Sequence, residues 1–231
     1  NNNPELAFVQ LVGDAAQIPT PTYAGGGSDP SYVMLVGNDH YPDMFIGRFS
    51  AENTTHVQTQ VERSIYYERD IIAGEWLSKS MGVASNEGPG DNNEYDHQHL
   101  NVIRNLLLDY TYNHVDQFYQ PSATATQVTN ALNEGRSFAN YTGHGSNTTW
   151  STTGFSNNHI NALTNDNKLP FIVSVACVNG NFTATTCFAE AWLRATNNST
   201  GAPTGAISTY MATINQAWYE PMRGQDIITE L

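Results

Sequence analysis

Short apolar runs alternate along the chain with segments in which apolar residues recur at helical spacing. The runs predict strands at residues 8–12, 32–36, 44–49, 80–84, 115–119 and 206–211, and two more that end just before His144 and Cys177. The helical segments are residues 57–72, 99–110, 123–132 and 160–163, one that opens at Cys187 and one from Met222 onward. This alternation is typical of an α/β protein with a mainly parallel sheet.

Two of the predicted strands end at chemically reactive residues. Residues 137–145 read SFANYTGHG, and residues 171–180 read FIVSVACVNG. Because the carboxyl ends of parallel strands share one edge of a sheet, the imidazole of His144 and the thiol of Cys177 are expected side by side. A Cys nucleophile with a His base is the minimal arrangement for covalent acyl transfer. The small Gly145 beside the histidine can direct its N–H toward a developing oxyanion.

Composition narrows the class of protein. The chain has 231 residues, of which 39% are hydrophobic and 13% charged, as in a folded globular protein. A net charge of -13 disfavours nucleic acid and anionic membranes as partners. It fits a basic substrate or bound cations, although acidity that merely maintains solubility is an equal alternative. No apolar run approaches the ~20 residues that a membrane-spanning helix needs.

The two cysteines are Cys177 and Cys187, and a disulfide between them is the alternative to a free nucleophile. A disulfide would leave His144 without its partner. We therefore expect Cys177 to be a free thiol and Cys187 to be a small buried residue in a helix.

The motifs YTGHG and VACVNGNF resemble the catalytic core of the gingipains, secreted bacterial cysteine peptidases with a caspase-like fold. Further segments resemble the arginine-specific branch in the same order, among them VGNDHYPDMFIGRFSAE, VASNEGPGDNNEYDHQH, CFAEAWLRA and ATINQAWYEPMRGQD. The resemblance covers essentially the whole chain. It implies a caspase-like α/β fold and a secreted endopeptidase that cleaves after arginine, with protein or peptide substrates that carry a basic P1 residue.

The resemblance also assigns catalytic roles. Cys177 would be the nucleophile, His144 the general base and acid, and Glu87 the carboxylate that orients the histidine. The N–H groups of Gly145 and Cys177 would bind the oxyanion. The alternatives are an inert buried cysteine, a structural histidine and a solvated loop carboxylate.

The same resemblance places Asp96 at the base of the P1 pocket, where a carboxylate can bind a guanidinium bidentately. The loop between Glu87 and Asp96 is slightly shorter than in the family pattern. Trp218 would form the pocket wall, with Gln216 and Met222 beside it. In the lysine-specific branch the pocket acid follows the tryptophan segment instead, so Glu220 is the alternative acid.

Structural calcium is the cofactor that the resemblance implies, bound by hard oxygen ligands. The candidate ligands form three sets: Asp14, Val36, Asp39, Tyr41 and Asp43; Glu94, His99, Phe182 and Glu190; and Asp226 with Glu230. Val36, Tyr41 and Phe182 would contribute their carbonyl oxygens. Solvated acids without a metal are the alternative.

We place a boundary near residue 76. Residues 1–76 would be the C-terminal part of a first, smaller α/β subdomain, and residues 77–231 the catalytic subdomain, incomplete at its C-terminal end. The chain opens at a strand and stops inside a helix, so we expect a longer precursor, with a propeptide or further chain segments as partners.

Two other functions stay open. A lysine-preferring or broader caspase-like peptidase would share the mechanism but not depend on Asp96 for its P1 preference. A truncated, non-catalytic binding or structural domain would not react with an arginyl chloromethylketone.

Overall fold

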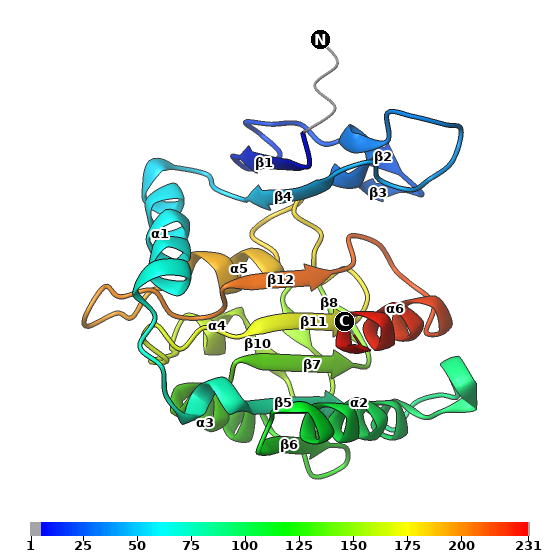
Figure 1. The fold of residues 1–231 in the computed structure, drawn as a ribbon, viewed down its shortest axis with the longest axis vertical. Helices are drawn as coiled ribbons and strands as arrows, with labels where there is room; N and C mark the ends of the chain where they lie inside the picture. The colour runs from blue at the N-terminus through cyan, green and yellow to red at the C-terminus, as the bar shows by residue number, and fades with distance from the viewer. Residues whose placement is uncertain (1–5, 231) are drawn as a thin grey trace.

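A computed structural model describes residues 6–230 and has an α/β fold built around one parallel sheet (Figure 1). The sheet has five strands in the order β12-β11-β7-β5-β6, all parallel. Their bounds are β5 Lys79–Ala84, β6 His114–Tyr119, β7 Phe138–Thr142, β11 Phe171–Val175 and β12 Ser208–Met211. The predicted α/β class with a mainly parallel sheet is confirmed.

Almost all side chains of the three central strands, β5, β7 and β11, are buried. This pattern is expected for parallel strands whose two faces are both covered. In their register, Ala84 of β5 lies beside Thr142 of β7, and Thr142 lies beside Val175 of β11. The three strands therefore end level with one another. Whatever follows each of them in the sequence begins at the same edge of the sheet.

Helices cover both faces of the sheet (Figure 1). On one face α2 (Asp96–Tyr110) and α6 (Tyr219–Glu230) pack on each other and on the central strands. The opposite face carries the larger core, into which α3 (Ala125–Glu134), α4 (Asn157–Ile160) and α5 (Phe188–Arg194) contribute. Alternate residues of β7 point to the two cores, as the period of a strand dictates.

The N-terminal part has a separate two-stranded parallel sheet of β1 (Phe8–Val12) and β4 (Phe45–Phe49). A short hairpin, β2 (Thr22–Tyr23) and β3 (Gly26–Gly27), and a 3-10 helix at Asp29–Val33 lie between them in the sequence. Helix α1 (Thr54–Ile65) then leads to the central sheet. The two sheets are distinct, but the division into subdomains near residue 76 stays a prediction.

Helix α1 is held by a buried arginine. The guanidinium of Arg63 donates hydrogen bonds to the carbonyl oxygens of Trp192, Ala195 and Ala206. Burial lowers the pKa of Arg63 to about 9. Carbonyl groups at the end of α5 are a favourable environment for a cation, because the last turn of a helix leaves its acceptors exposed.

Most predicted elements agree with the structure to within a few residues, but the strand at residues 32–36 is wrong. A 3-10 helix at Asp29–Val33, with Pro30 in its first turn, overlaps this segment, and Leu35 and Val36 lie exposed after it. Sequence reasoning also missed a small antiparallel sheet directly after His144: β8 (Gly145–Ser146), β9 (Thr149–Trp150) and β10 (Phe155–Ser156). Strands of two residues are too short for their periodicity to be seen. In residues 6–230, no helix is long and apolar enough to cross a membrane.

Candidate active site

The predicted catalytic residues follow the three central strands. Glu87 comes three residues after β5, His144 two residues after β7, and Cys177 two residues after β11. Because these strands are adjacent and end in register, all three residues emerge at one edge of the sheet. The Gly143 N–H donates to the Val175 carbonyl oxygen at 3.1 Å, so the loops that carry His144 and Cys177 begin in contact.

The imidazole of His144 is exposed at this edge and meets the edge of an indole. The ring centroids of His144 and Trp218 lie 4.9 Å apart with an interplanar angle of 81°. A cavity of about 220 Å³ is lined by Glu87, Gly88, Pro89, His144 and Trp218. The predicted orienting carboxylate and the predicted base therefore share one cavity with the predicted pocket wall.

A larger cavity of about 660 Å³ has Arg48, Glu190, Gln216 and Glu220 among its lining residues. Neither Glu87 nor His144 lines it. We assign the chemistry to the smaller cavity, because the imidazole of His144 and the carboxylate of Glu87 both line it.

The backbone of His144 is fixed by two hydrogen bonds to its carbonyl oxygen. The Tyr141 hydroxyl donates at 2.6 Å and the Ser151 N–H at 3.0 Å. Hydrogen-bonded and non-hydrogen-bonded pairs alternate in an antiparallel ladder, so the next pair, Gly145 with Trp150, is the non-hydrogen-bonded kind. The Gly145 N–H consequently points away from β9, as an oxyanion donor requires.

Cys177 is a half-buried free thiol whose Sγ lies 3.8 Å from the Gln216 carbonyl oxygen. The following residue, Val178, has a φ of 52°, which is rare for a β-branched residue. Such strain occurs where surrounding contacts impose it. Cys187 is also free but fully buried, and burial raises the pKa of its thiol to about 12. The prediction of free cysteines is confirmed.

The predicted pocket acid, Asp96, is fully buried at the first position of α2. One carboxylate oxygen accepts from the Trp218 indole N–H, and the other from the Ser85 hydroxyl. Burial raises the pKa of Asp96 above its ordinary value, while the bonds from Ser85 and Trp218 oppose that shift. The alternative acid, Glu220, is exposed and lines the larger cavity.

The other two predicted pocket residues also lie near this edge. Gln216 donates from its side-chain amide to the Ala176 carbonyl oxygen at 3.2 Å, next to the nucleophile. Met222 is fully buried in α6 beneath the loop after β5, where a side chain at Gly90 would collide with its sulfur. Met222 thus packs under the loop that contains Pro89. Its backbone N–H also donates to the Trp218 carbonyl oxygen, which fixes the backbone of Trp218 just before α6.

Sequence reasoning missed Ser85, Asn179 and Tyr141, which hold the site together through hydrogen bonds. The signal for Ser85 and Asn179 is their position, since each lies within two residues of a predicted site residue. Nothing in the local pattern distinguishes Tyr141 from any other buried aromatic residue of a strand.

The structure groups the predicted calcium ligands differently from the three sets predicted from the sequence. Asp226 of α6 lies next to Glu94 and His99. The Nδ1 atom of His99 is 3.4 Å from Glu94 Oε2 and 3.5 Å from Asp226 Oδ1. Glu230 ends the same helix. Burial, followed by neighbouring carboxylates, raises the pKa of Asp226. Within residues 6–230, no three His, Cys, Asp or Glu side chains are already arranged to hold a metal ion.

The tautomer of His99 follows from Gln225. The Gln225 amide donates to Asn140 and accepts from the Thr142 hydroxyl, so its oxygen faces His99 Nε2 at 3.1 Å and accepts that proton. The His99 Nδ1 atom and Asp226 Oδ1 are buried, and neither has a hydrogen-bond partner in the described part of the chain. The arrangement favours a cation at this point.

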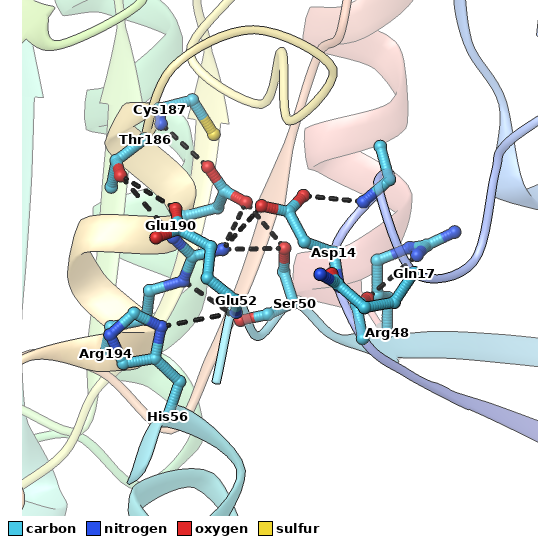
Figure 2. A network of polar contacts seen from close by, with 12 residues as sticks. Asp14, Gln17, Arg48, Ser50, Glu52, His56, Thr186, Cys187, Glu190 and Arg194 are labelled. Atoms are coloured by element: carbon cyan, nitrogen blue, oxygen red, sulfur yellow. Dashed lines mark hydrogen bonds and ion pairs between the residues drawn. The ribbon is translucent and has the colours of Figure 1, made fainter. Parts of the chain in front are cut away.

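Glu190 lies in another network, shown in Figure 2. Its carboxylate accepts from the Ser50 hydroxyl at 2.5 Å, the Cys187 N–H at 2.8 Å and the Arg194 guanidinium at 2.7 Å. Asp14, from the first predicted calcium set, also faces Arg194 at 3.3 Å. Phe182 stacks its ring under Arg48 at 4.9 Å.

The remaining members of the first set lie in the exposed loop before β4. Asp43 accepts from the N–H groups of Leu35 and Val36, which lower the pKa of its carboxyl group. Asp39 accepts from the Tyr41 N–H at 2.9 Å. These carboxylates organise the loop in the structure as it stands.

The sequence profile of peptidase family C25 matches residues 1–229. The chain belongs to this family. It is 48% identical to gingipain R2 of Porphyromonas gingivalis over 98% of this chain and 31% of that protein. The chain therefore spans about a third of the length of this relative.

Two solved structures share the fold of this C25 member. The crystal structure of the Arg-specific cysteine proteinase gingipain R superposes with a TM-score of 0.95 at 46% identity, covering all of this chain and 54% of that one. The complex of pro- and mature domains of RgpB from Porphyromonas gingivalis gives a TM-score of 0.96 at 47% identity, with 100% and 55% coverage. The resemblance to the arginine-specific gingipains is confirmed.

Proposed function

We propose that this chain forms the catalytic part of a cysteine endopeptidase that hydrolyses peptide bonds after arginine. One observation carries the proposal: Trp218 contacts the ring of His144 and donates its indole N–H to the buried Asp96. A single side chain thus links the proton-transfer group to an acid suited to a guanidinium. The membership of family C25 supports the same reaction.

Acylation begins when the thiolate of Cys177 attacks the carbonyl carbon of the scissile bond. A covalent tetrahedral species forms, and its oxyanion accepts hydrogen bonds from the N–H groups of Gly145 and Cys177. The imidazolium of His144 then donates its proton to the leaving amine as the C–N bond breaks. The products of this step are a thioester on Cys177 and a free amine.

Deacylation uses the same groups in reverse. The neutral His144 removes a proton from a water molecule, which attacks the thioester carbonyl, and the C–S bond breaks to return the thiolate. Glu87 lines the cavity with His144 and stabilises the imidazolium form in both steps. The exposure of His144 gives water access to it.

Asp96 supplies the preference for arginine. Its two oxygens already accept from two donors, Ser85 and Trp218, so a guanidinium fork can replace the indole N–H without reorienting the carboxylate. A bound guanidinium also stabilises the ionised form that burial disfavours. The exposed Glu220 offers no comparable buried site for lysine.

Calcium is proposed as a structural ion, with Glu94 and Asp226 as its oxygen ligands and His99 beside them. The support is that two buried polar atoms at this point, His99 Nδ1 and Asp226 Oδ1, have no hydrogen-bond partner among residues 6–230. When bound, the ion supplies positive charge that joins α6 to the loop before α2. Trp218 precedes α6 and Asp96 opens α2, so this junction lies behind the pocket.

The proposal includes secretion and regulation by a propeptide. Its support is that a relative's mature domain has been solved in complex with its pro-domain. The substrates would be proteins or peptides with a basic P1 residue, consistent with the chain's net charge of -13.

Cleavage of paired fluorogenic peptides with Arg or Lys at P1 tests the proposal on the full-length protein. Turnover of the Arg peptide that Cys177→Ala abolishes is the expected result. Asp96→Asn should lower kcat/KM for the Arg peptide by about 10²-fold or more, because a buried charge-assisted pair is lost. Equal loss for both peptides would assign the specificity elsewhere, and no turnover by the wild type would reject the function.

A further inference from the structure

Asn179 follows the predicted nucleophile by two residues and is fully buried. Its side-chain amide donates to the carbonyl oxygens of Ser146 at 2.6 Å and Thr149 at 3.2 Å. Both acceptors belong to the β8–β9 hairpin, which begins immediately after His144. Asn179 therefore bridges the loop of the thiol and the hairpin of the imidazole.

The orientation of this amide is determined by its surroundings. The Ser174 hydroxyl donates to Asn179 Oδ1 at 2.9 Å, and the Trp150 indole N–H donates to the Ser174 oxygen at 2.9 Å. Exchanging the oxygen and nitrogen of the amide would place its oxygen against the two carbonyl oxygens of the hairpin. Both amide protons are therefore committed to backbone acceptors, and Asn179 is not an oxyanion donor.

The two loops that Asn179 joins are packed as closely as backbone permits. A side chain at Gly145 would place its Cβ 2.8 Å from Ala176 Cβ, 2.9 Å from Asn179 Nδ2 and 3.0 Å from the Cys177 carbonyl oxygen. Only glycine allows this approach. The separation of the loops is thus defined by contact on one side and by the Asn179 hydrogen bonds on the other.

We propose that Asn179 is a positioning residue that sets the spacing between Cys177 and the His144–Gly145 segment. The inference rests on the proposed peptidase function and adds a residue to its machinery. Asn179 acts through the hairpin and does not touch the substrate. Its bridge is made of neutral groups, so it aligns the thiol and the imidazole without adding a charge next to them.

Asn179→Asp tests this inference in the full-length protein, because it keeps the shape of the side chain and turns its donors into an acceptor. The carboxylate would repel the Ser146 and Thr149 carbonyl oxygens and separate the loops. We expect kcat for an Arg peptide to fall by about 10²-fold with KM within about threefold, the cost of displacing a reacting group by about 1 Å. We also measure the rate of Cys177 alkylation by iodoacetamide as a function of pH. The pH at which this rate increases should be higher in Asn179→Asp than in the wild type.

Asn165→Asp is the matched control. Asn165 is also fully buried, donates to the carbonyl oxygens of Lys168 and Gly205 and accepts from the Gly205 N–H. It precedes β11, whereas Asn179 follows that strand. Asn165→Asp should weaken the fold to a similar degree and leave kcat and the alkylation profile of the folded protein unchanged.

If Asn179→Asp does not fold, Ser174→Ala decides the question, since it removes the hydroxyl that orients the amide and leaves the Asn179 side chain in place; the Trp150 indole N–H loses its acceptor as well. A fall in kcat with unchanged KM supports the inference, and an unchanged kcat overturns it. An active wild type whose Asn179→Asp variant keeps its kcat, or an equal loss in Asn165→Asp, overturns it as well. A wild type that neither cleaves the peptide nor reacts with iodoacetamide rejects the proposed function and this inference with it.

Discussion

Two acidic clusters of this chain differ in the cation that faces them. In the first, which we call the Arg194 cluster, Asp14, Glu52 and Glu190 all lie within ion-pair distance of Arg194 (Figure 2). In the second, the His99 cluster, Glu94 and Asp226 face an imidazole nitrogen that has no hydrogen-bond partner among the described residues. The first cluster carries the fixed positive charge of Arg194, whereas no Lys or Arg is paired with the carboxylates of the second among the described residues.

The difference explains why similar residues in a sequence need not share a role. A buried carboxylate must be paired or neutralised, and a guanidinium with several donors can serve two or three carboxylates at once. Glu190 and Asp14 are already paired with Arg194, so we expect them to contribute little to calcium binding. The carboxylates of the His99 cluster are not paired with a Lys or Arg among the described residues, so we expect the stability of the protein to depend on an ion bound there.

The largest expected effect comes from removing the fixed cation. Arg194→Met leaves the buried Glu190 and the partly buried Asp14 without their cation, which should destabilise the protein by about 3–5 kcal/mol. Urea unfolding followed by circular dichroism measures the loss. The exposed pair of Arg69 and Asp70 supplies the control, since Arg69→Met should change stability by less than about 1 kcal/mol.

A loss below about 1 kcal/mol in Arg194→Met would contradict the view that the Arg194 cluster depends on its own cation. Peptide turnover per folded molecule should be retained, because none of the proposed catalytic residues is in this network. Loss of turnover without loss of stability would connect the cluster to the active site instead.

Calcium removal should have an intermediate effect, confined to the His99 cluster. At a calcium concentration 100-fold above the dissociation constant, binding stabilises a folded protein by about 2.7 kcal/mol, and chelation removes that stability. Thermal unfolding with calcium or with EGTA measures it. Asp226→Asn should reduce the calcium-dependent part, whereas the exposed Asp109→Asn on the same side of the sheet should not.

Equal melting temperatures with and without calcium would contradict calcium binding at the His99 cluster. A calcium effect that survives in Asp226→Asn and disappears in Asp43→Asn would move the ion to the loop before β4. Either result would remove the expected difference in ion dependence between the His99 cluster and the Arg194 cluster.

The smallest effect is expected at the rim of the Arg194 cluster. Glu52 is about half exposed, and the hydrogen bond from Arg194 lowers the pKa of its carboxyl group. Glu52→Gln should cost less than about 1 kcal/mol at neutral pH. Because the folded pKa is the lower one, this contribution is present above the unfolded carboxyl pKa and is lost as the pH falls through the folded value.

Unfolding of the wild type and Glu52→Gln at neutral and acidic pH measures that contribution. The difference in stability should shrink toward zero at the acidic end and also in high salt, which screens exposed charges. A difference that grows as the pH falls would mean that Glu52 is protonated in the folded state, contrary to the ion pair.

Much of the fold could be predicted from local patterns. Strands β5, β7 and β11 are short, mostly apolar segments because both of their faces are buried, and small residues follow their ends. The failures are equally physical. The run at residues 32–36 is apolar but follows Pro30, and the strands after His144 are too short to show a period.

Part of the candidate site could likewise be predicted from the sequence, and part could not. Its reactive residues, Cys177 and His144, could be located because parallel strands bring their carboxyl ends to one edge, whatever the details of packing. The sequence by itself therefore determined the class of fold, the residues able to carry the chemistry and, through the resemblance, the family.

Only the tertiary structure decided which distant groups share a hydrogen bond or a cation. In the folded chain Asp226 lies beside His99, and Glu190 forms an ion pair with Arg194. Asn179 connects the loop of Cys177 to the hairpin after His144 by hydrogen bonds. These contacts depend on how α6, α5 and the β8–β9 hairpin pack against the sheet. A period of two or of 3.6 residues shows which face of an element is buried, but the partner on that face is chosen by packing between segments far apart in the chain.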